Sequence, residues 1–362
     1  MNSARYSSQT ILPQVGVAGQ QQLKSVSVLC VGSGGLGCAC LYYLVAAGVG
    51  NVTIVDADIV DVSNLQRQIL FSVSDIGKLK VTAAKDRLLQ LNPEINITTI
   101  ASTITAANAS AIVQGHDLIV AATDSLATSF LLNDLAIKVQ IPLVYAAANK
   151  FTGQLAVFDT QLGACLRCLY PDYPRSLGNC ASSGILGALV GMLGSMQALE
   201  AIKLLLTKDN AHSDLLPLVS KLLTIDATSL EISKFHIAKD QTCAVCTLHS
   251  QSIVLQDYLP AIDDTLAIHT LSKDNNFTLI DVRSCSEWQY NALPTAINIP
   301  LNSLSSDQLQ QLLPPDKSAA YLIYCHTDTR SRQALSIFRD NGFTNVRYLA
   351  GGLAKLQLPN TS

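Results

Sequence analysis

Charged and aromatic residues are scarce in this chain of 362 residues. Asp, Glu, Lys and Arg together make up 14% of it, aromatic residues make up 6%, and the formal net charge is only −3. Because there is no basic run, the sequence is untypical of nucleic-acid-binding proteins, and we expect no nucleic-acid partner. Residues 1–6 also lack the apolar core of a secretory signal peptide, which favours a cytoplasmic protein.

One stretch approaches the composition of a membrane span but falls short of its length. Residues 184–199 are uncharged and the apolar character continues to Leu206, but Glu200 and Lys203 interrupt it. A membrane-spanning helix needs roughly 18 or more apolar residues. We therefore expect a buried core helix, with glycines at positions 184, 187, 191 and 194 allowing close backbone packing, and no membrane segment.

The ten cysteines do not follow the pattern of a small disulfide-linked secreted domain. Four of them form two Cys-x-x-Cys pairs, Cys165 with Cys168 and Cys243 with Cys246. Four thiolates can close a tetrahedral zinc site with no open coordination position, which is typical of a structural metal. We expect such a Zn²⁺ site in a reducing compartment. The alternatives are free buried cysteines or a redox pair.

Strands and helices alternate through the first part of the chain. Short apolar runs bounded by turn residues predict strands, and the longer stretches between them predict helices. The alternation predicts an α/β fold with a Rossmann-like, doubly wound and mostly parallel sheet, whose ligand crevice lies beyond the carboxyl ends of the strands. The expected strands are 26–31, 51–55, 95–100, 117–121, 141–146, 154–158 and 222–225, and the expected helices include 38–47, 78–91 and 126–139.

A second, smaller α/β unit follows after a weakly patterned stretch. Strands over 279–282 and 321–324 and a helix over 330–341 are predicted there. We therefore expect a first domain over 1–250, a linker over 251–264 and a second domain over 265–362. Within the first domain, residues 170–183 carry two prolines and several small polar residues, which predicts a mobile loop holding Cys180.

A glycine-rich turn, Gly32-Ser33-Gly34-Gly35-Leu36-Gly37, joins the first predicted strand to a helix. Asp56 ends the next strand about twenty residues on, the spacing of a dinucleotide-binding fingerprint. Glycines let the backbone approach a phosphate, and a helix N-terminus favours an anion. The turn predicts an adenine nucleotide, and taken alone it also fits the nicotinamide cofactor of an oxidoreductase.

Charged residues beyond this turn favour a triphosphate. Arg67 and Lys80 supply positive charge suited to ATP. Asp124, just after the strand 117–121, could hold Mg²⁺ together with phosphate oxygens. Hydride transfer has no evident use for these cations. The alternative interpretation of Arg67 and Lys80 is two solvated surface charges.

A series of short motifs runs in order through about residues 4–246. They are Arg5-Tyr6, Gly16 with Gly19-Gln20, 32–37, 47–50, 63–68, Lys80, Asn92-Pro93, Thr123-Asp124, Gly153-Gln154, 197–200 and the two cysteine pairs. Together they resemble the ubiquitin-activating-enzyme-like adenylyltransferase family, and most of all its MoeB, ThiF and HesA type members, which activate small sulfur-carrier proteins.

This resemblance implies an ATP site, with Arg67 and Asp124 in the catalytic machinery, and a homodimer. It implies nucleotide contacts at Gly35, Asp56, Asn64, Arg67, Lys80 and Asp124. The full set that we assign to nucleotide binding is Gly32, Gly34, Gly35, Asp56, Ser63, Asn64, Leu65, Gln66, Arg67, Lys80, Asp124 and Ser125.

A third constellation follows the predicted strand 321–324. The loop Cys325-His326-Thr327-Asp328-Thr329-Arg330 places a thiol at a strand end and an arginine at the start of a helix. Successive loop amides can form an anion-binding nest, and a helix dipole lowers the pKa of a thiol. The loop suits a persulfide or a phosphate, and its four residues between cysteine and arginine, one fewer than in cysteine phosphatases, favour a single sulfur. The alternative is a structural cysteine.

Further motifs accompany this loop: 279–283, Glu287-Trp288, 296–300, Gly342-Phe343 and Gly351-Gly352. Over about residues 265–355 they resemble a single rhodanese domain, which implies a sulfurtransferase with a persulfide on Cys325. The two resemblances together imply a sulfur-carrier activating enzyme fused to its sulfur donor. ATP then adenylates the C-terminal glycine of a small ubiquitin-like carrier ending in Gly-Gly, Cys325 passes on sulfur, and Cys180 takes part in releasing a thiocarboxylate.

The expected upstream sulfur donor is a cysteine desulfurase or thiosulfate, and the pathway stays open between molybdenum cofactor, thiamine, thiolated tRNA and a cysteine or siderophore route. Three positions depart from the family pattern. Ser8 and Ser129 stand where relatives carry arginine, and Ser125 stands where asparagine is usual. These departures support a second hypothesis, a binding or scaffold protein with a decayed nucleotide site that retains rhodanese activity.

Overall fold

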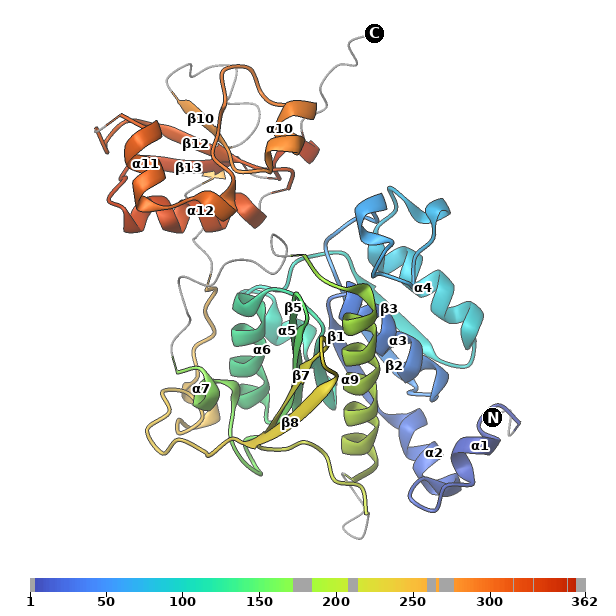
Figure 1. The fold of residues 1–362 in the computed structure, drawn as a ribbon. Helices are drawn as coiled ribbons and strands as arrows, with labels where there is room; N and C mark the ends of the chain where they lie inside the picture. The colour runs from blue at the N-terminus through green and yellow to red at the C-terminus, as the bar shows by residue number, and fades with distance from the viewer. Residues whose placement is uncertain are drawn as a thin grey trace. The chain divides into compact units, whose positions relative to one another are not determined.

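A computed structural model describes residues 4–171, 184–207, 214–258, 265–266, 277–314, 316–327, 329–349 and 351–355. The chain divides into two compact units, and the division falls between Tyr258 and Leu259 (Figure 1). The first unit carries the glycine turn and both cysteine pairs. The second carries the Cys325 loop.

One eight-stranded sheet, in the order β3-β2-β1-β4-β5-β6-β7-β8, forms the first unit. The strands β1 to β5 run parallel, and β6, β7 and β8 each run antiparallel to the strand before. The predicted doubly wound, mostly parallel fold is thereby confirmed. The strands are β1 (Ser27–Val31), β2 (Asn51–Val55), β3 (Asn96–Ile100), β4 (Leu118–Ala121), β5 (Leu143–Asn149), β6 (Thr152–Phe158), β7 (Lys221–Asp226) and β8 (Glu231–His236).

Helices cover both faces of this sheet, so the central strands are buried on both sides and are almost wholly apolar. On one face lie α3 (Gly35–Ala46), α4 (Lys80–Leu91) and α9 (Gly187–Thr207), and on the other α5 (Ala109–Ile112) and α6 (Leu126–Val139) (Figure 1). The remaining elements are α1 (Ser7–Thr10), α2 (Gly16–Ser25), α7 (Leu166–Leu169) and the single-turn helices η1 (Val62–Asn64), η2 (Val73–Asp75) and η3 (Ser250–Ser252).

The predicted buried helix is α9, which packs against α3, β5 and β6. By length and composition alone it could cross a membrane, but here it is a core helix. A Cβ on Gly35 would lie 2.7 Å from the Val190 side chain, and one on Gly194 would collide with the Leu36 carbonyl. Buried Gln197 donates to the carbonyl of Ala121 at 2.8 Å. These contacts hold α9 across the start of α3, where the glycine turn ends.

The N-terminal motif and the segment 47–50 form one packing cluster rather than a ligand site. The Tyr6 hydroxyl accepts a hydrogen bond of 2.8 Å from Asn92 Nδ2. Gly48 has φ +83°, and a Cβ there would lie 2.6 Å from the Tyr6 ring. Gln20 Nε2 donates to the Ala47 carbonyl at 2.9 Å. The cluster fixes the end of α3 against α2 and the start of the chain.

The second unit is a smaller sheet of five parallel strands in the order β11-β10-β12-β13-β9. Its strand β12 is wholly buried, ends at Tyr324 and is followed directly by Cys325, as predicted. The strands are β9 (Thr265–Leu266), β10 (Thr278–Asp281), β11 (Ile297–Asn298), β12 (Tyr321–Tyr324) and β13 (Val346–Leu349), and the helices are α10 (Cys285–Tyr290), α11 (Ser306–Leu312), α12 (Thr329–Asp340) and the single turns η6 (Leu301–Ser303) and η7 (Leu353–Lys355).

Candidate functional site

The glycine turn leaves the backbone open at the start of α3. Gly32 has φ +98°, and a Cβ there would lie 2.5 Å from the carbonyl oxygen of Ala122. A Cβ on Gly37 would collide with the Gly32 carbonyl. The helix begins at Gly35, three residues earlier than the sequence predicts, with Gly34 as its N-cap. Its first amides therefore face the crevice at the carboxyl ends of β1 and β4, where an anion is favoured.

Asp56 organises this turn from the end of β2. Its Oδ2 accepts hydrogen bonds from the amide and the hydroxyl of Ser33, at 2.8 and 2.9 Å. Its Oδ1 accepts from the amide of Asp58 at 2.9 Å. Each carboxylate oxygen can accept a further hydrogen bond, so Asp56 can hold the turn and still receive the ribose hydroxyls that the sequence assigns to it.

The two cations predicted for the triphosphate lie at the same crevice. Lys80 is 5% exposed, and its Nζ donates to Asp58 Oδ2 at 2.9 Å. A solvated surface charge is therefore the wrong interpretation of Lys80. Arg67 is half-buried and donates to the carbonyl of Ser63 at 3.1 Å.

Asp124 faces both cations. It keeps an exposed side, but the protein around it raises the pKa of its carboxyl by desolvation, while the charges of Lys80 and Arg67 lower it. The negative charge of Asp58 raises it further. A cation bound between Asp124 and phosphate oxygens would offset the repulsion between Asp124 and Asp58. Carboxylate and phosphate oxygens are the ligands that Mg²⁺ prefers.

The segment 61–67 closes the crevice on one side. Asp61 caps the turn η1 by accepting from the amide of Ser63 at 2.8 Å, and Asn64 completes the capping box. A Cβ on Gly187 would collide with the Gln66 carbonyl, so α9 begins directly against this segment. The predicted positions Ser63, Asn64, Leu65 and Gln66 thus lie on one short turn that leads into Arg67.

Two residues at this site were given no role from the sequence, Asp58 and Gln68, although Gln68 ends the motif 63–68. Asp58 was not singled out, yet it holds the Lys80 ammonium. Gln68 is 4% exposed, and its Oε1 has no hydrogen-bond partner among the described residues. Its Nε2 lies 3.8 Å from where a Cβ of Gly34 would stand. A buried carbonyl without a donor beside the glycine turn can accept from a bound nucleotide, so the residues present fit one.

Two of the three serines that depart from the family pattern have structural partners. Ser125 is the N-cap of α6, where its hydroxyl accepts from the amide of Thr128 at 3.2 Å. The hydroxyl of Ser129, 2% exposed, donates to the Ser125 carbonyl at 3.2 Å. Ser8 lies exposed on α1. The hydroxyls of these two serines therefore stabilise the first turn of α6, which follows Asp124.

The two cysteine pairs meet in space, 78 residues apart in the chain. The Sγ atoms of Cys165, Cys168, Cys243 and Cys246 all lie within 4.8 Å of one another. Neighbouring sulfurs are 3.6 to 3.8 Å apart. Four sulfurs bound to one zinc at about 2.3 Å in a tetrahedron lie about 3.8 Å apart, so the cluster fits that ion. The spacing is much longer than a disulfide bond, so the four thiols are unbridged here.

The Cys325 loop is shaped by the turn at Gly351-Gly352. Gly352 has φ +58°, and a Cβ there would collide with the carbonyl of Thr327. The amides of Leu353 and Ala354 donate to the carbonyls of Cys325 and His326 at 2.9 and 2.8 Å. The two bonds fix the carbonyls of Cys325 and His326, which fits the anion-holding nest predicted from the sequence.

At the end of this loop, Arg330 is bound by Glu287 on α10. Its Nη1 and Nη2 each donate to one carboxylate oxygen at 2.7 Å. The Arg330 guanidinium is the main cause that lowers the pKa of Glu287 to about 2. Asp281 and Arg283 form a second, buried ion pair of 2.7 Å beneath the loop. Cys325 itself is 1% exposed.

Two of the assigned residues, Cys180 and Asp328, lie outside the described residues, as does most of the predicted loop 170–183. Among the other cysteines, Cys30, Cys38 and Cys40 are buried, and burial raises the pKa of each thiol, that of Cys38 to about 12. These three thiols stay protonated at neutral pH and belong to the hydrophobic core.

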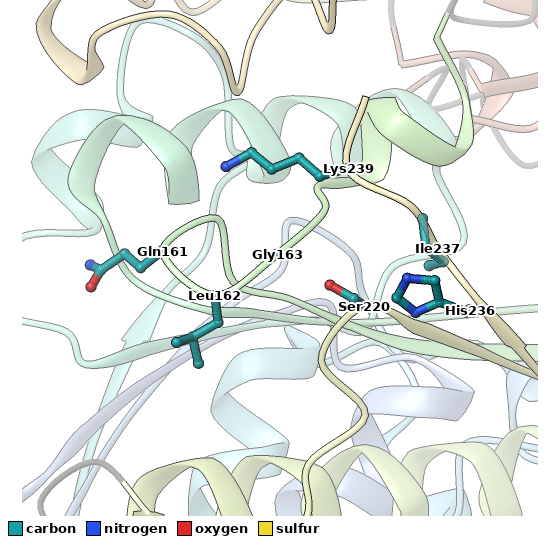
Figure 2. A pocket seen from close by; sticks show the side chains of 7 residues that line it. All are labelled: Gln161, Leu162, Gly163, Ser220, His236, Ile237 and Lys239. Atoms are coloured by element: carbon teal, nitrogen blue, oxygen red, sulfur yellow. The ribbon is translucent and has the colours of Figure 1, made fainter. Parts of the chain in front are cut away.

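Two cavities stand out in the first unit. One of about 380 Å³ lies at the amino ends of the parallel strands, away from the glycine turn (Figure 2). None of its lining residues was assigned a function: Gln161, Leu162, Gly163, Ser220, His236, Ile237 and Lys239. The other, of about 400 Å³, lies at the carboxyl end of β5 and is lined by residues 147–149, 152–154 and 224–226.

Comparison with known proteins identifies both units. The ThiF family model matches residues 6–245, and the rhodanese-like domain model matches residues 266–358. The chain is 35% identical to adenylyltransferase and sulfurtransferase UBA4 of Meyerozyma guilliermondii, over 97% of this chain and 87% of that protein. It is 37% identical to adenylyltransferase and sulfurtransferase MOCS3 of Drosophila grimshawi, over 97% and 83%.

Solved structures show the same fold for the first unit. E. coli MccB with MccA-N7isoASN aligns with a TM-score of 0.60 at 23% identity, covering 68% of this chain and 75% of that one. MccB with ATP aligns with a TM-score of 0.57 at 22% identity. The chain belongs to the ThiF family, carries a rhodanese-like domain behind the ThiF domain, and is an enzyme of the adenylyltransferase and sulfurtransferase class.

Proposed function

We propose that this enzyme adenylates the C-terminal glycine of a small ubiquitin-like carrier protein and then converts the carboxylate into a thiocarboxylate. The single observation that carries the proposal is the joint presence of a charged nucleotide crevice and a nest-like cysteine loop in one chain. Thiocarboxylate formation requires an activated acyl group and a persulfide. The first unit would supply the activated acyl group, and the second would supply the persulfide.

In the first step, the carrier carboxylate attacks the α-phosphate of ATP, and pyrophosphate leaves. The amides at the start of α3 donate hydrogen bonds to phosphate oxygens, and the Asp56 carboxylate accepts hydrogen bonds from the ribose hydroxyls. Lys80 and Arg67 offset the charge that develops on the leaving pyrophosphate. Lys80 must exchange Asp58 for phosphate to do so, which makes Asp58 a placeholder that keeps the buried ammonium paired before ATP binds.

The carrier tail has a candidate path to this crevice. The cavity of about 400 Å³ lies at the carboxyl end of β5, the strand next to β4, and Asp124 follows β4. Its walls include the small residues Ala147, Ala148 and Gly153, which leave room for a main chain without bulky side chains. A tail ending in Gly-Gly carries no bulky side chains and would fit this cavity.

Two metal ions belong to this proposal. Asp124 would hold Mg²⁺ with the phosphate oxygens of ATP, and the ion would neutralise phosphate charge. The Cys165, Cys168, Cys243 and Cys246 cluster would hold Zn²⁺ with all four positions filled by sulfur. A closed site of that kind ties segments together and takes no part in the reaction.

In the second step, the terminal sulfur of a Cys325 persulfide attacks the acyl-adenylate carbon and AMP leaves. The product is an acyl disulfide between the carrier and Cys325. Attack by the Cys180 thiol on the Cys325 sulfur then forms a Cys325–Cys180 disulfide and releases the thiocarboxylate. An external thiol reductant must restore both cysteines, and a cysteine desulfurase or thiosulfate supplies the next sulfur. Such chemistry suits a reducing cytoplasm.

ATP–pyrophosphate exchange tests the first step directly. With Mg²⁺, a carrier ending in Gly-Gly should support exchange of labelled pyrophosphate into ATP, and the same carrier lacking its last glycine should not. Exchange that is absent with every such carrier would favour the alternative, a binding protein with a decayed nucleotide site. A homodimer, the oligomer that the family resemblance implies, is tested separately by sedimentation.

A further inference from the structure

The two cysteine pairs differ in how the rest of the first unit holds them. The pair at 165–168, here called the first pair, encloses Leu166 and Arg167, and both of these residues bond to α6. The amide of Leu166 donates to Asn133 Oδ1 at 2.8 Å. Arg167 donates to Asp134 from Nε at 3.1 Å and from Nη2 at 2.7 Å. The turn between the two cysteines is therefore fixed to the helix at both of its central residues.

Asn133 and Asp134 are themselves held in place. They are 1% and 2% exposed. Asn133 Nδ2 donates to Asp134 Oδ1 at 3.1 Å, and the hydroxyl of Tyr258 donates to Asp134 Oδ2 at 2.7 Å. The guanidinium carbon of Arg167 also lies 5.3 Å from the centre of the Phe130 ring. A buried carboxylate is stable only when it is paired and hydrogen-bonded, so this network favours a single arrangement of its side chains.

The second pair, at 243–246, is held by bonds of a different kind. Asp240 Oδ1 accepts from the amide and the hydroxyl of Thr242 at 2.8 and 2.7 Å, in a turn at the surface. The amide of Asp240 donates to Cys168 Sγ at 3.4 Å, and an apolar cluster that includes Ile137 of α6 packs against the pair. Figure 1 shows α7 beside α6, and the tan loop after β8 close to α7. Buried polar side chains thus support the first pair, and a surface turn with apolar packing supports the second.

This difference matters for an ion that needs four thiolates in a tetrahedron. Each sulfur must lie about 2.3 Å from a bound zinc ion. A turn that already has the required geometry loses less conformational entropy when the ion binds, so the ion binds more tightly. Residues that orient metal ligands without coordinating the metal typically contribute about 10- to 100-fold to metal affinity. Asn133 and Asp134 have that position relative to the first pair.

We propose that Asn133 and Asp134 are positioning residues for the zinc site: they hold the first pair of thiolates in the metal-binding arrangement before the ion arrives. This inference rests on the zinc site of the proposed function. Neither side chain is one of the four sulfur ligands, and each acts through the turn between Cys165 and Cys168. The alternative is that these bonds only stabilise the first unit. Any equally destabilising change on α6 would then weaken zinc binding as much.

The test measures the zinc affinity of the full chain, by titrating the reduced, metal-free protein with Zn²⁺ alone against a chromogenic chelator. Asn133→Ala removes the acceptor of the Leu166 amide and should weaken zinc binding by about 10- to 100-fold. Arg167→Lys keeps the charge opposite Asp134 but loses one of the two hydrogen bonds, so it should weaken binding less. It takes the place of Asn133→Ala if that variant does not fold. With Co²⁺ instead of Zn²⁺, both variants should keep the absorption spectrum of tetrahedral thiolate coordination, because all four sulfurs remain.

Two control variants separate positioning from stability. Leu132→Ala removes a fully buried side chain of α6, about 160° around the helix from Asp134. It should lower the thermal stability at least as much as Asn133→Ala and leave the zinc affinity unchanged. Asp240→Ala removes only the surface turn before the second pair and should change the affinity by no more than about twofold.

Two results would overturn the inference. One is an unchanged zinc affinity in Asn133→Ala, or in Arg167→Lys where it takes that variant's place. The other is an equal loss of affinity in Leu132→Ala, which would make the effect one of general stability. A wild-type chain that takes up no zinc would instead overturn the zinc site of the proposed function, and the inference with it.

Discussion

The ammonium of Lys80 lies 2.9 Å from the carboxylate of Asp58, although Lys80 is buried and Asp58 is mostly exposed. The pair connects α4 to the loop after β2, and the antiparallel bridge between Ile59 and Leu79 holds those two segments together. A buried cation at a nucleotide crevice thus has an exchangeable partner. ATP can replace Asp58 without the protein ever burying an unpaired ammonium.

Lys80→Ala should lower the rate of carrier-dependent ATP–pyrophosphate exchange by about 10- to 100-fold, because it removes a charge-assisted hydrogen bond to phosphate. Lys78→Ala is the matched control, since that lysine is about half exposed and pairs with Asp75 at 2.9 Å. The control should exchange at the wild-type rate. Equal activity of both variants would show that Lys80 does not contact the nucleotide.

Gly352→Ala should abolish transfer of sulfur from thiosulfate to cyanide and destabilise the rhodanese-like unit by at least about 2 kcal/mol. The added Cβ collides with the Thr327 carbonyl and so distorts the Cys325 loop. Gly342→Ala is the control. Its φ is also positive, +86°, but a Cβ there meets only the flexible end of Lys317 at 3.4 Å. It should cost about 1 kcal/mol and leave sulfur transfer intact. An active Gly352→Ala enzyme would show that the turn does not shape the loop.

The Glu287–Arg330 pair should make the stability of the second unit depend on pH. The folded-state pKa of Glu287 is about 2, below its ordinary value of 4.5. A lowered pKa stabilises the fold above pH 4.5, and the gain is lost as pH falls towards 2. Because 38% of the side chain is exposed, solvent screening reduces the gain to about 1 kcal/mol.

Chemical denaturation of the wild type and of Glu287→Gln checks this dependence. The wild type should be about 1 kcal/mol more stable above pH 4.5, and the difference between the two should shrink as pH falls and vanish below pH 2. Subtracting the curves cancels the other carboxylates. A difference that is the same at every pH would mean that the pair does not hold Arg330.

Cys165→Ser should lower the zinc content of the purified protein well below one ion per chain. Cys285→Ser, an exposed cysteine outside the cluster, should leave the content unchanged. Loss of a closed zinc site should destabilise the first unit by roughly 3 kcal/mol or more, because binding energy at such a site is folding energy. If the purified wild-type protein contained no zinc, the four cysteines would be free buried thiols.

The parts of the fold that the sequence predicts well are those in which local signals and burial agree. The helix Leu126–Val139 begins and ends at the predicted residues because Ser125 caps it and its core face is apolar. The strand β8 was not predicted. It lies at the sheet edge with Ile232 and Phe235 exposed, so no alternation of buried and polar residues marks it.

At the candidate site, residue types were predictable but pairings were not. The glycine turn, Arg67, Lys80 and the cysteines follow from motif spacing. The pairing of Lys80 with Asp58 and the burial of Gln68 depend on how the loop after β2 folds back on α4, which no local pattern encodes. The hydrogen bond from the Tyr258 hydroxyl to the buried carboxylate of Asp134 likewise joins residues 124 positions apart.

The most direct test of the account is the mass of the carrier after reaction with MgATP, a sulfur donor and the full-length enzyme. The wild type should yield a carrier whose mass has changed by the replacement of one oxygen with sulfur, and Cys325→Ser should yield only the adenylate. A carrier that leaves the wild-type reaction adenylated but never thiolated would contradict the joint action of the two units, and an unmodified carrier would contradict adenylation itself.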